Sequence, residues 1–141
     1  MLQLSAGTLA RVAIFLSTEW LQQLDEAARA SDSLHALGAV DPFVIEQRVQ
    51  GGPDGDVAYH FVFGAEGTRV APGPADQPDL TVTADYETAV ALHAGELNAQ
   101  QALGSGGLRL SGAPNDVLRR ADALRNLDDV FAAVRASTTL S

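Results

Sequence analysis

The sequence predicts an α+β fold in which a five-stranded, mostly antiparallel sheet carries helices packed on one face. Two observations lead to this prediction. The candidate strands alternate apolar and polar residues, which is typical of a sheet with one covered face and one wet face. The strands of 43–71 follow one another without a helix between them, and segments with helical apolar spacing lie before and after them, as in α+β proteins.

The chain length indicates a single domain. A chain of 141 residues suits one domain and buries roughly 70% of its unfolded surface. We expect that domain over residues 17–136. Residues 1–16 lack caps and are uncertain, since a helical face and a disordered start fit them equally well, and residues 137–141 are expected to fray.

The first element predicted is a helix over 18–30. Ser17 is placed to cap its N-terminus, Leu16 and Leu21 can form a hydrophobic staple, and Trp20 begins the apolar stripe. The polar run 31–33 is expected to end the helix.

A β-hairpin is predicted next. Strand 43–49 places Phe43, Ile45 and Val49 on one face and Glu46 and Arg48 on the other. The Gly/Pro/Asp-rich stretch 51–56 suits a turn, and strand 57–63 brings the most aromatic face of the chain. A short strand at 68–71 is expected to extend the meander before the prolines of 72–78.

The remaining elements form a strand, two helices, a strand and further helical turns. Strand 80–84 leads to a helix capped by Asp85 and ended by Gly95. Asn98 with Gln101 forms a capping-box signature for a shorter helix, which the glycines of 104–107 end before strand 108–112. From Pro114 onward, apolar residues again recur at helical spacing.

Charge and composition favour some function classes over others. Nine basic and eighteen acidic residues give a net charge of −9, which opposes phosphate backbones and anionic membrane surfaces. With no cysteine, disulfides and thiolate chemistry are excluded. The N-terminal apolar run is too weak for a secretion signal and no run is long enough to span a bilayer. We therefore expect a cytoplasmic protein that is not integral to a membrane and binds no nucleic acid.

Polar motifs give only weak signals for catalysis or metal binding. The histidines 35, 60 and 93 have no metal-ligand spacing, and His60 is expected to face solvent. The glycine-rich 104–107 matches neither a nucleophile elbow nor a phosphate loop, and 54–56 is too short for calcium. The arginines 119, 120 and 125 suit surface ion pairs better than a head-group site. We predict no metal, no cofactor and no catalytic residue.

The stretch 79–112 resembles the C-terminal core of the sterol carrier protein (type two) lipid-binding family. The resemblance rests on the order of elements and on nine residues of "GELNAQQAL" and "SGGLRLSG": Gly95, Leu97, Asn98, Gln100, Ala102, Ser105, Gly106, Leu108 and Gly112. It implies an apolar tunnel between sheet and helices that binds a ligand without covalent chemistry. Where the family commonly carries aromatic residues, this chain has Leu103-Gly104, so the resemblance does not extend to a preference for sterols.

The leading hypothesis is therefore binding of a lipid such as a sterol, fatty acid or fatty acyl-CoA in an internal apolar cavity, with transfer left open. The residues expected to line the cavity are apolar or aromatic, with one histidine: Trp20, Ile45, Tyr59, Phe61, Phe63, Val82, Val90, His93, Leu97, Leu103, Leu108 and Phe131. A dry, packed core would use the same residue types. An interaction module with a solid core is thus the main alternative, and an enzyme that uses His93 or Tyr59 as an acid–base group is the third. The sequence leaves the oligomeric state open.

Overall fold

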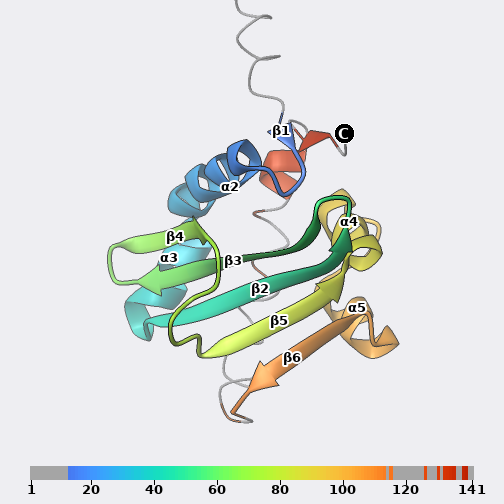
Figure 1. The fold of residues 1–141 in the computed structure, drawn as a ribbon. Helices are drawn as coiled ribbons and strands as arrows, with labels where there is room; N and C mark the ends of the chain where they lie inside the picture. The colour runs from blue at the N-terminus through green and yellow to red at the C-terminus, as the bar shows by residue number, and fades with distance from the viewer. Residues whose placement is uncertain are drawn as a thin grey trace, which may run out of the picture.

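The computed structural model describes residues 13–113, 115, 126, 130, 132–135 and 138–139. Its centre is a five-stranded sheet with strand order β4-β3-β2-β5-β6 (Figure 1). The strands are β2 (Phe43–Gly52), β3 (Gly55–Gly64), β4 (Gly67–Pro72), β5 (Leu80–Asp85) and β6 (Leu108–Gly112). The helices are α2 (Thr18–Ala30), α3 (Asp32–Val40), α4 (Tyr86–Ala94) and α5 (Ala99–Ser105).

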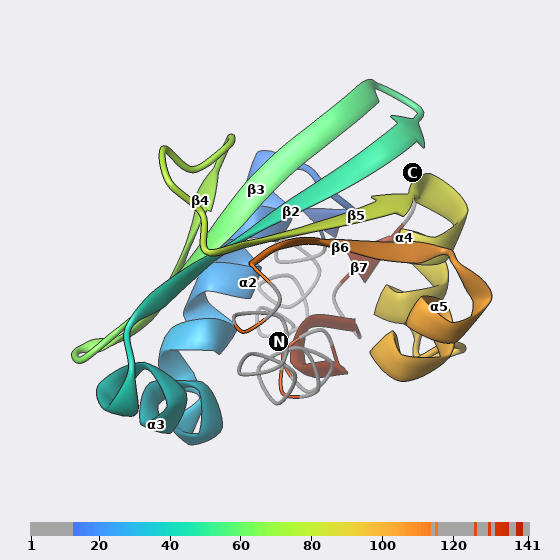
Figure 2. The same ribbon diagram turned by 90° about the horizontal axis from the view of Figure 1, so that it is seen from below.

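The sheet is mixed, and the helices lie on one side of it. The β2–β3, β3–β4 and β5–β6 pairs are antiparallel, whereas β2 and β5 run parallel. Figure 2 shows α2, α3, α4 and α5 on the same side of the sheet. The predicted α+β class, the five strands and the one-sided helices are therefore confirmed. The parallel pair requires the chain to cross from the β4 edge to the far side of β2.

Helix α2 begins where the sequence predicts. The Ser17 hydroxyl accepts a hydrogen bond from the Trp20 N–H at 3.2 Å, and the helix packs on β4. Its buried Asp25 accepts the Val70 N–H of β4 at 2.7 Å and ion pairs from Arg29 and Arg69. Burial alone would raise the pKa of Asp25, but these hydrogen bonds and charges outweigh it and lower the pKa below its usual value. Asp25 thus fixes α2 to the edge strand.

Helix α3 is not predicted by the sequence. The run 31–33 was expected to end a helix, but Ser31 also starts the next one, because its hydroxyl accepts the Leu34 N–H at 3.3 Å.

Gly38 within this helix is needed for close packing of α3 on β3. A Cβ at this position would lie 2.6 Å from the Gly64 main-chain oxygen, so only glycine lets α3 approach β3 this closely.

The outer face of the sheet is not uniformly wet, which corrects the prediction. Glu46 is 1% exposed, because the loop between β4 and β5 crosses this face. The Glu46 carboxylate accepts the Ala75 N–H at 2.9 Å and pairs with Arg48. His60 does not face open solvent, since its Nδ1 lies 2.8 Å from the Gly73 main-chain oxygen. These polar residues hold the crossing loop on the sheet.

A short parallel pairing brings the two ends of the described chain together. Strand β1 (Ala13–Ile14) pairs with β7 (Thr138–Thr139), and the Phe15 N–H donates to the Thr139 carbonyl at 2.7 Å. The sequence led us to expect fraying at 137–141, but Thr138 and Thr139 are held by this pairing. In this way β1 presents Phe15 to the core, where it is 6% exposed.

Some sequence predictions fall outside the described residues. These are the expected cavity-lining residue Phe131, the arginines 119, 120 and 125, and most of the helical segment after Pro114. Val130 and residues 132–135 are helical, as the spacing predicts, and Val130 and Val134 are buried.

Candidate functional site

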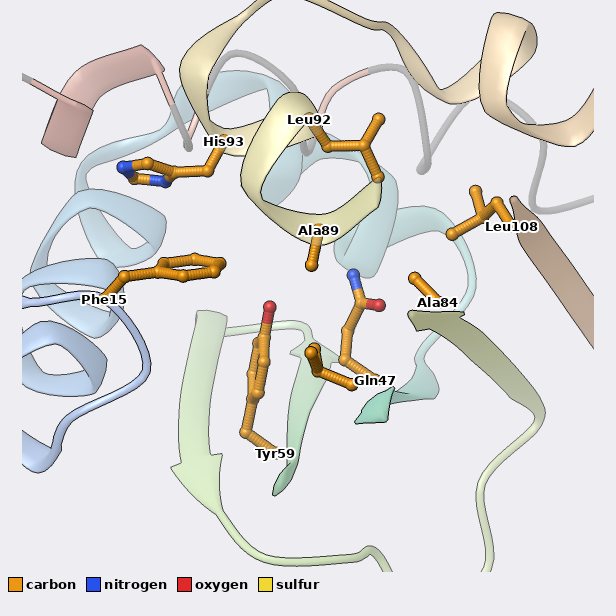
Figure 3. Close-up of a pocket in the computed structure, with 9 residues that line it drawn as sticks. Phe15, Gln47, Tyr59, Ala84, Ala89, Leu92, His93 and Leu108 are labelled. Carbon is orange, nitrogen blue, oxygen red and sulfur yellow. The ribbon is translucent and has the colours of Figure 1, made fainter. Parts of the chain in front are cut away.

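A small cavity lies between α4 and the inner, helix-covered face of the sheet (Figure 3). Its volume is about 20 Å³, which is room for a water molecule but not for a lipid. The lining comes from β2, β3, β5, β6, α4 and the segment before α2, and its residues are Phe15, Gln47, Val49, Tyr59, Ala84, Ala89, Leu92, His93 and Leu108.

Helix α4 forms the roof of this cavity, and its ends are fixed as the sequence predicts. The Asp85 carboxylate accepts the Thr88 N–H at 2.8 Å, and Gly95 adopts the left-handed conformation with φ of 79°. These caps set the helix so that Ala89, Leu92 and His93 are buried. The small Ala89 side chain leaves space above the sheet, as Figure 3 shows.

An aromatic cluster closes one side of the cavity. The Phe15 ring centroid lies 4.9 Å from that of Trp20 and 5.0 Å from that of His93. Trp20 in turn packs edge-on against Tyr59, with the centroids 5.6 Å apart. Leu16, with φ of 71°, makes the sharp turn from Phe15 into α2, and such a conformation is uncommon for a residue other than glycine.

Of the described residues around the cavity, three have polar side chains and the others are apolar. The three are Gln47, Tyr59 and His93. Gln47 and Tyr59 rise from the sheet toward Ala89, as Figure 3 shows. Burial lowers the pKa of His93 to about 4, and the charge of Arg135 adds to this effect. Burial also raises the pKa of the Tyr59 hydroxyl. All three groups are therefore uncharged near neutral pH.

The structure brings only some of the predicted ligand-binding residues to this cavity. Tyr59, His93 and Leu108 line it, and Trp20 supports it through the aromatic cluster. Val90 and Leu97 are half-buried beside the core. The predicted residues of the sheet interior are fully buried in the packed core and do not line the cavity: Ile45, Phe61, Phe63 and Val82.

Leu103 is predicted to line the cavity, and the structure corrects this. Its side chain is 37% exposed, because α5 turns Ala99 and Ala102 toward the core instead.

Part of the cavity lining is not predicted by the sequence. Gln47 lies between Ile45 and Val49 on the inward face of β2. A polar residue at an apolar position of the alternation was the available signal. Phe15 lies in the segment considered uncertain, and Ala84, Ala89 and Leu92 gave no signal, because cavity and core positions carry the same residue types.

The described residues contain neither a metal centre nor a membrane-spanning helix. No group of three or more His, Asp or Glu side chains in the described part of the chain could hold a metal ion. Among the helices of residues 13–113 and the short described segments beyond them, none has the length and apolar character to cross a membrane.

Comparison with known proteins places the site in a family context. Residues 19–125 match the SCP-2 sterol transfer family. No curated protein matches the chain. A solution structure of a conserved hypothetical protein from Thermus thermophilus is similar, with a TM-score of 0.68, 21% identity and coverage of 90% of this chain and 92% of that one.

Two further structures share the fold. The crystal structure of a sterol carrier protein 2 gives a TM-score of 0.67 at 20% identity, covering 83% of this chain and 96% of that one. The solution structure of palmitated SCP2L2 from Aedes aegypti gives 0.53 at 23% identity, covering 77% and 94%. At these identities the similarity establishes the fold only. What the site binds must be inferred from the residues of this chain.

Proposed function

Because the chain belongs to the SCP-2 sterol transfer family, we propose that it is a non-catalytic carrier that binds a lipid between α4 and the inner face of the sheet. A sterol, a fatty acid or a fatty acyl-CoA would suit such a site. The match over 19–125 carries the proposal, because it spans the sheet and the helix α4 that enclose the cavity. A related structure is described as palmitated, which supports an acyl chain as one ligand.

Binding requires the cavity to enlarge. Its volume of about 20 Å³ compares with roughly 300–1,000 Å³ for pockets that hold drug-sized ligands. Phe15 is the side chain whose movement would enlarge the cavity most directly, since it lies outside residues 19–125 and fills the space beside His93 and Trp20. The segment carrying it is held by the two-residue pairing of β1 with β7. An apolar ligand would replace the contacts of this ring and gain roughly 25 cal/mol per Å² of buried apolar surface before the costs of binding.

The small cavity also favours the second candidate, an interaction module with a solid core. Such a module would bind a protein partner and hold no lipid. The two functions differ in what the purified protein retains.

Native mass spectrometry of the purified chain, followed by organic extraction, tests the proposal. A lipid at one per chain is the expected result. If the protein is recovered free of lipid, uptake of Nile red, an uncharged dye that fluoresces in apolar surroundings, is measured next. Absence of both a retained lipid and dye uptake would leave the solid-core module as the better assignment.

A matched pair of variants locates the site. Ala89→Phe fills the space under α4, because Ala89 lines the cavity, and should reduce dye uptake at least about tenfold. Ala94→Phe makes the same change at an exposed position of the same helix and should leave uptake unchanged. Thermal unfolding of both variants checks that the fold persists, since overpacking costs about 1–3 kcal/mol. Equal uptake by the two variants would place the ligand elsewhere.

A further inference from the structure

The floor of the cavity carries a pair of neighbouring polar side chains. Gln47 of β2 and Tyr59 of β3 are directly opposite each other in the antiparallel register. Opposite residues have Cβ atoms about 4.5–5.5 Å apart and point to the same face. Both side chains line the cavity, and Figure 3 shows the Gln47 amide and the Tyr59 hydroxyl directed toward α4.

This pair has unused hydrogen-bonding capacity. Within the part of the chain that the structure describes, neither the Tyr59 hydroxyl nor the Gln47 side-chain amide makes a hydrogen bond. Tyr59 is 3% exposed, whereas Gln47 is half-buried. Since an enclosed polar group gains from a hydrogen-bond partner, the Tyr59 hydroxyl favours a ligand that brings a polar atom to this end of the cavity. Together the amide and the hydroxyl can donate to and accept from a single ligand oxygen.

The charge around the cavity is the second observation. Among the described residues that line it, there is no Lys, Arg, Asp or Glu. The charged neighbours in sequence, Glu46 and Arg48, lie on the opposite face of β2 and pair with each other. Arg135 lies at the end of α4, where its Nε donates to the His93 main-chain oxygen at 2.8 Å. With respect to the described lining, a carboxylate in the cavity would be desolvated without a cation in contact, which is strongly unfavourable.

We propose that Gln47 and Tyr59 form the polar subsite of the lipid pocket and select lipids whose buried end is an uncharged hydroxyl or carbonyl over lipids that end in a carboxylate. This inference rests on the proposed carrier function and narrows its ligand class. The ligand would enter with its oxygen toward the sheet and its hydrocarbon beneath α4 and along the aromatic cluster, so that the polar end lies inside the protein.

Competition against Nile red on the full chain at neutral pH tests the proposal. The competitors are dodecanol, dodecanoate and dodecane, which share one chain length and differ in the end group. Dodecanol should bind at least about tenfold more tightly than dodecanoate, because only the carboxylate must be desolvated as an ion.

Two variants assign the preference to the pair. Gln47→Leu and Tyr59→Phe each remove one hydrogen-bonding group at nearly constant volume. Each should weaken dodecanol binding by about three- to tenfold, as expected for one hydrogen bond, and leave dodecane binding unchanged. Gln50→Leu is the matched control, since Gln50 is exposed and its side chain accepts from Arg109 at 3.1 Å. That variant should bind all three competitors like the parent chain.

The outcomes separate this inference from the carrier function. Equal binding of dodecanol, dodecane and dodecanoate, or unchanged dodecanol binding by both variants, would overturn the polar subsite while the carrier function stands. That second result would mean that water molecules hydrogen-bond to Gln47 and Tyr59 both with and without a bound ligand. Failure of Nile red and of all three competitors to bind would overturn the carrier function and the subsite together.

Discussion

Glu46 and Gln47 are adjacent in sequence and lie on opposite faces of β2, and their surroundings differ sharply. Glu46, on the outer face, is buried under the crossing loop and meets partners for its carboxylate in Ala75 and Arg48. Gln47, on the inner face, lines a cavity and has no side-chain hydrogen bond within the described residues. A satisfied buried charge is part of the architecture, whereas a half-buried amide that lines a cavity is available to a ligand.

The same contrast extends to the rest of the two faces. On the outer face, Glu46 and His60 tie down the loop between β4 and β5. Burial alone would raise the pKa of Glu46, but the hydrogen bonds from Arg48 and Ala75 outweigh it, so its pKa is lowered. Above the inner face, His93 of α4 is buried with its pKa lowered to about 4. The outer face therefore holds a charge beneath the crossing loop, whereas the described groups that line the cavity are uncharged.

The largest expected effect comes from Phe15→Ala, which enlarges the cavity above the inner face of the sheet. Loss of this buried ring should reduce the free energy of unfolding by about 3 kcal/mol, the usual cost of truncating a core phenylalanine. It should also increase Nile red uptake, because the ring fills space that a ligand needs. Urea unfolding and dye titration measure the two effects. Reduced stability with no gain in uptake would show that Phe15 is a core residue and not a plug.

The second effect is a pH dependence of the free energy of unfolding, which arises from the buried His93. Between pH 6.5 and about 4 the unfolded chain protonates His93 and the folded chain does not. The unfolded state then binds more protons, so stability is full above pH 6.5 and decreases as the pH falls, by at most about 3 kcal/mol in total.

His93→Phe should remove this slope, as measured by urea unfolding across that range. The groups around His93 are Arg135, which stays charged, and the rings of Phe15 and Trp20. Asp25 and Glu46 have lowered pKa values, so their contributions are lost only at lower pH, below about 4.5, and should persist in the variant. An unaltered slope in His93→Phe would mean that another group titrates in this window.

Matched leucine substitutions on β2 test the comparison itself. Glu46→Leu should cost about 2 kcal/mol, because the Ala75 N–H loses its acceptor and the crossing loop loses its attachment to the sheet. Urea unfolding measures this loss, and lipid binding at the opposite face should be retained. A neutral result would indicate that the loop does not depend on Glu46.

Gln47→Leu should have the smallest effect on stability, between zero and a gain of about 1 kcal/mol, since an unpaired amide is replaced by an apolar group. The same unfolding measurement compares it with Glu46→Leu. A loss as large as that of Glu46→Leu would show that the amide has a structural partner, and the contrast between the two faces would then disappear.

Local rules in the sequence determined much of this fold. The side chains of Ser17, Asp85 and Asn98 each accept a hydrogen bond from the N–H three residues on, as expected of N-caps. Gly95 ends α4 in the left-handed conformation. The alternation in 43–49 and 57–63 placed the aromatic residues on the inner face. These features depend on residues within a few positions of one another, so they can be read from the chain directly.

The tertiary structure decided which of the inward residues surround space and which fill it. Tyr59 and Phe61 share one strand and one face, yet Tyr59 meets the cavity and Phe61 is enclosed in the core. The difference arises from where α4 crosses the sheet and from the small side chain of Ala89. Likewise, Glu46 is buried only because a loop from the far edge of the sheet crosses it. Such outcomes depend on contacts between distant segments, which residue type and periodicity alone do not specify.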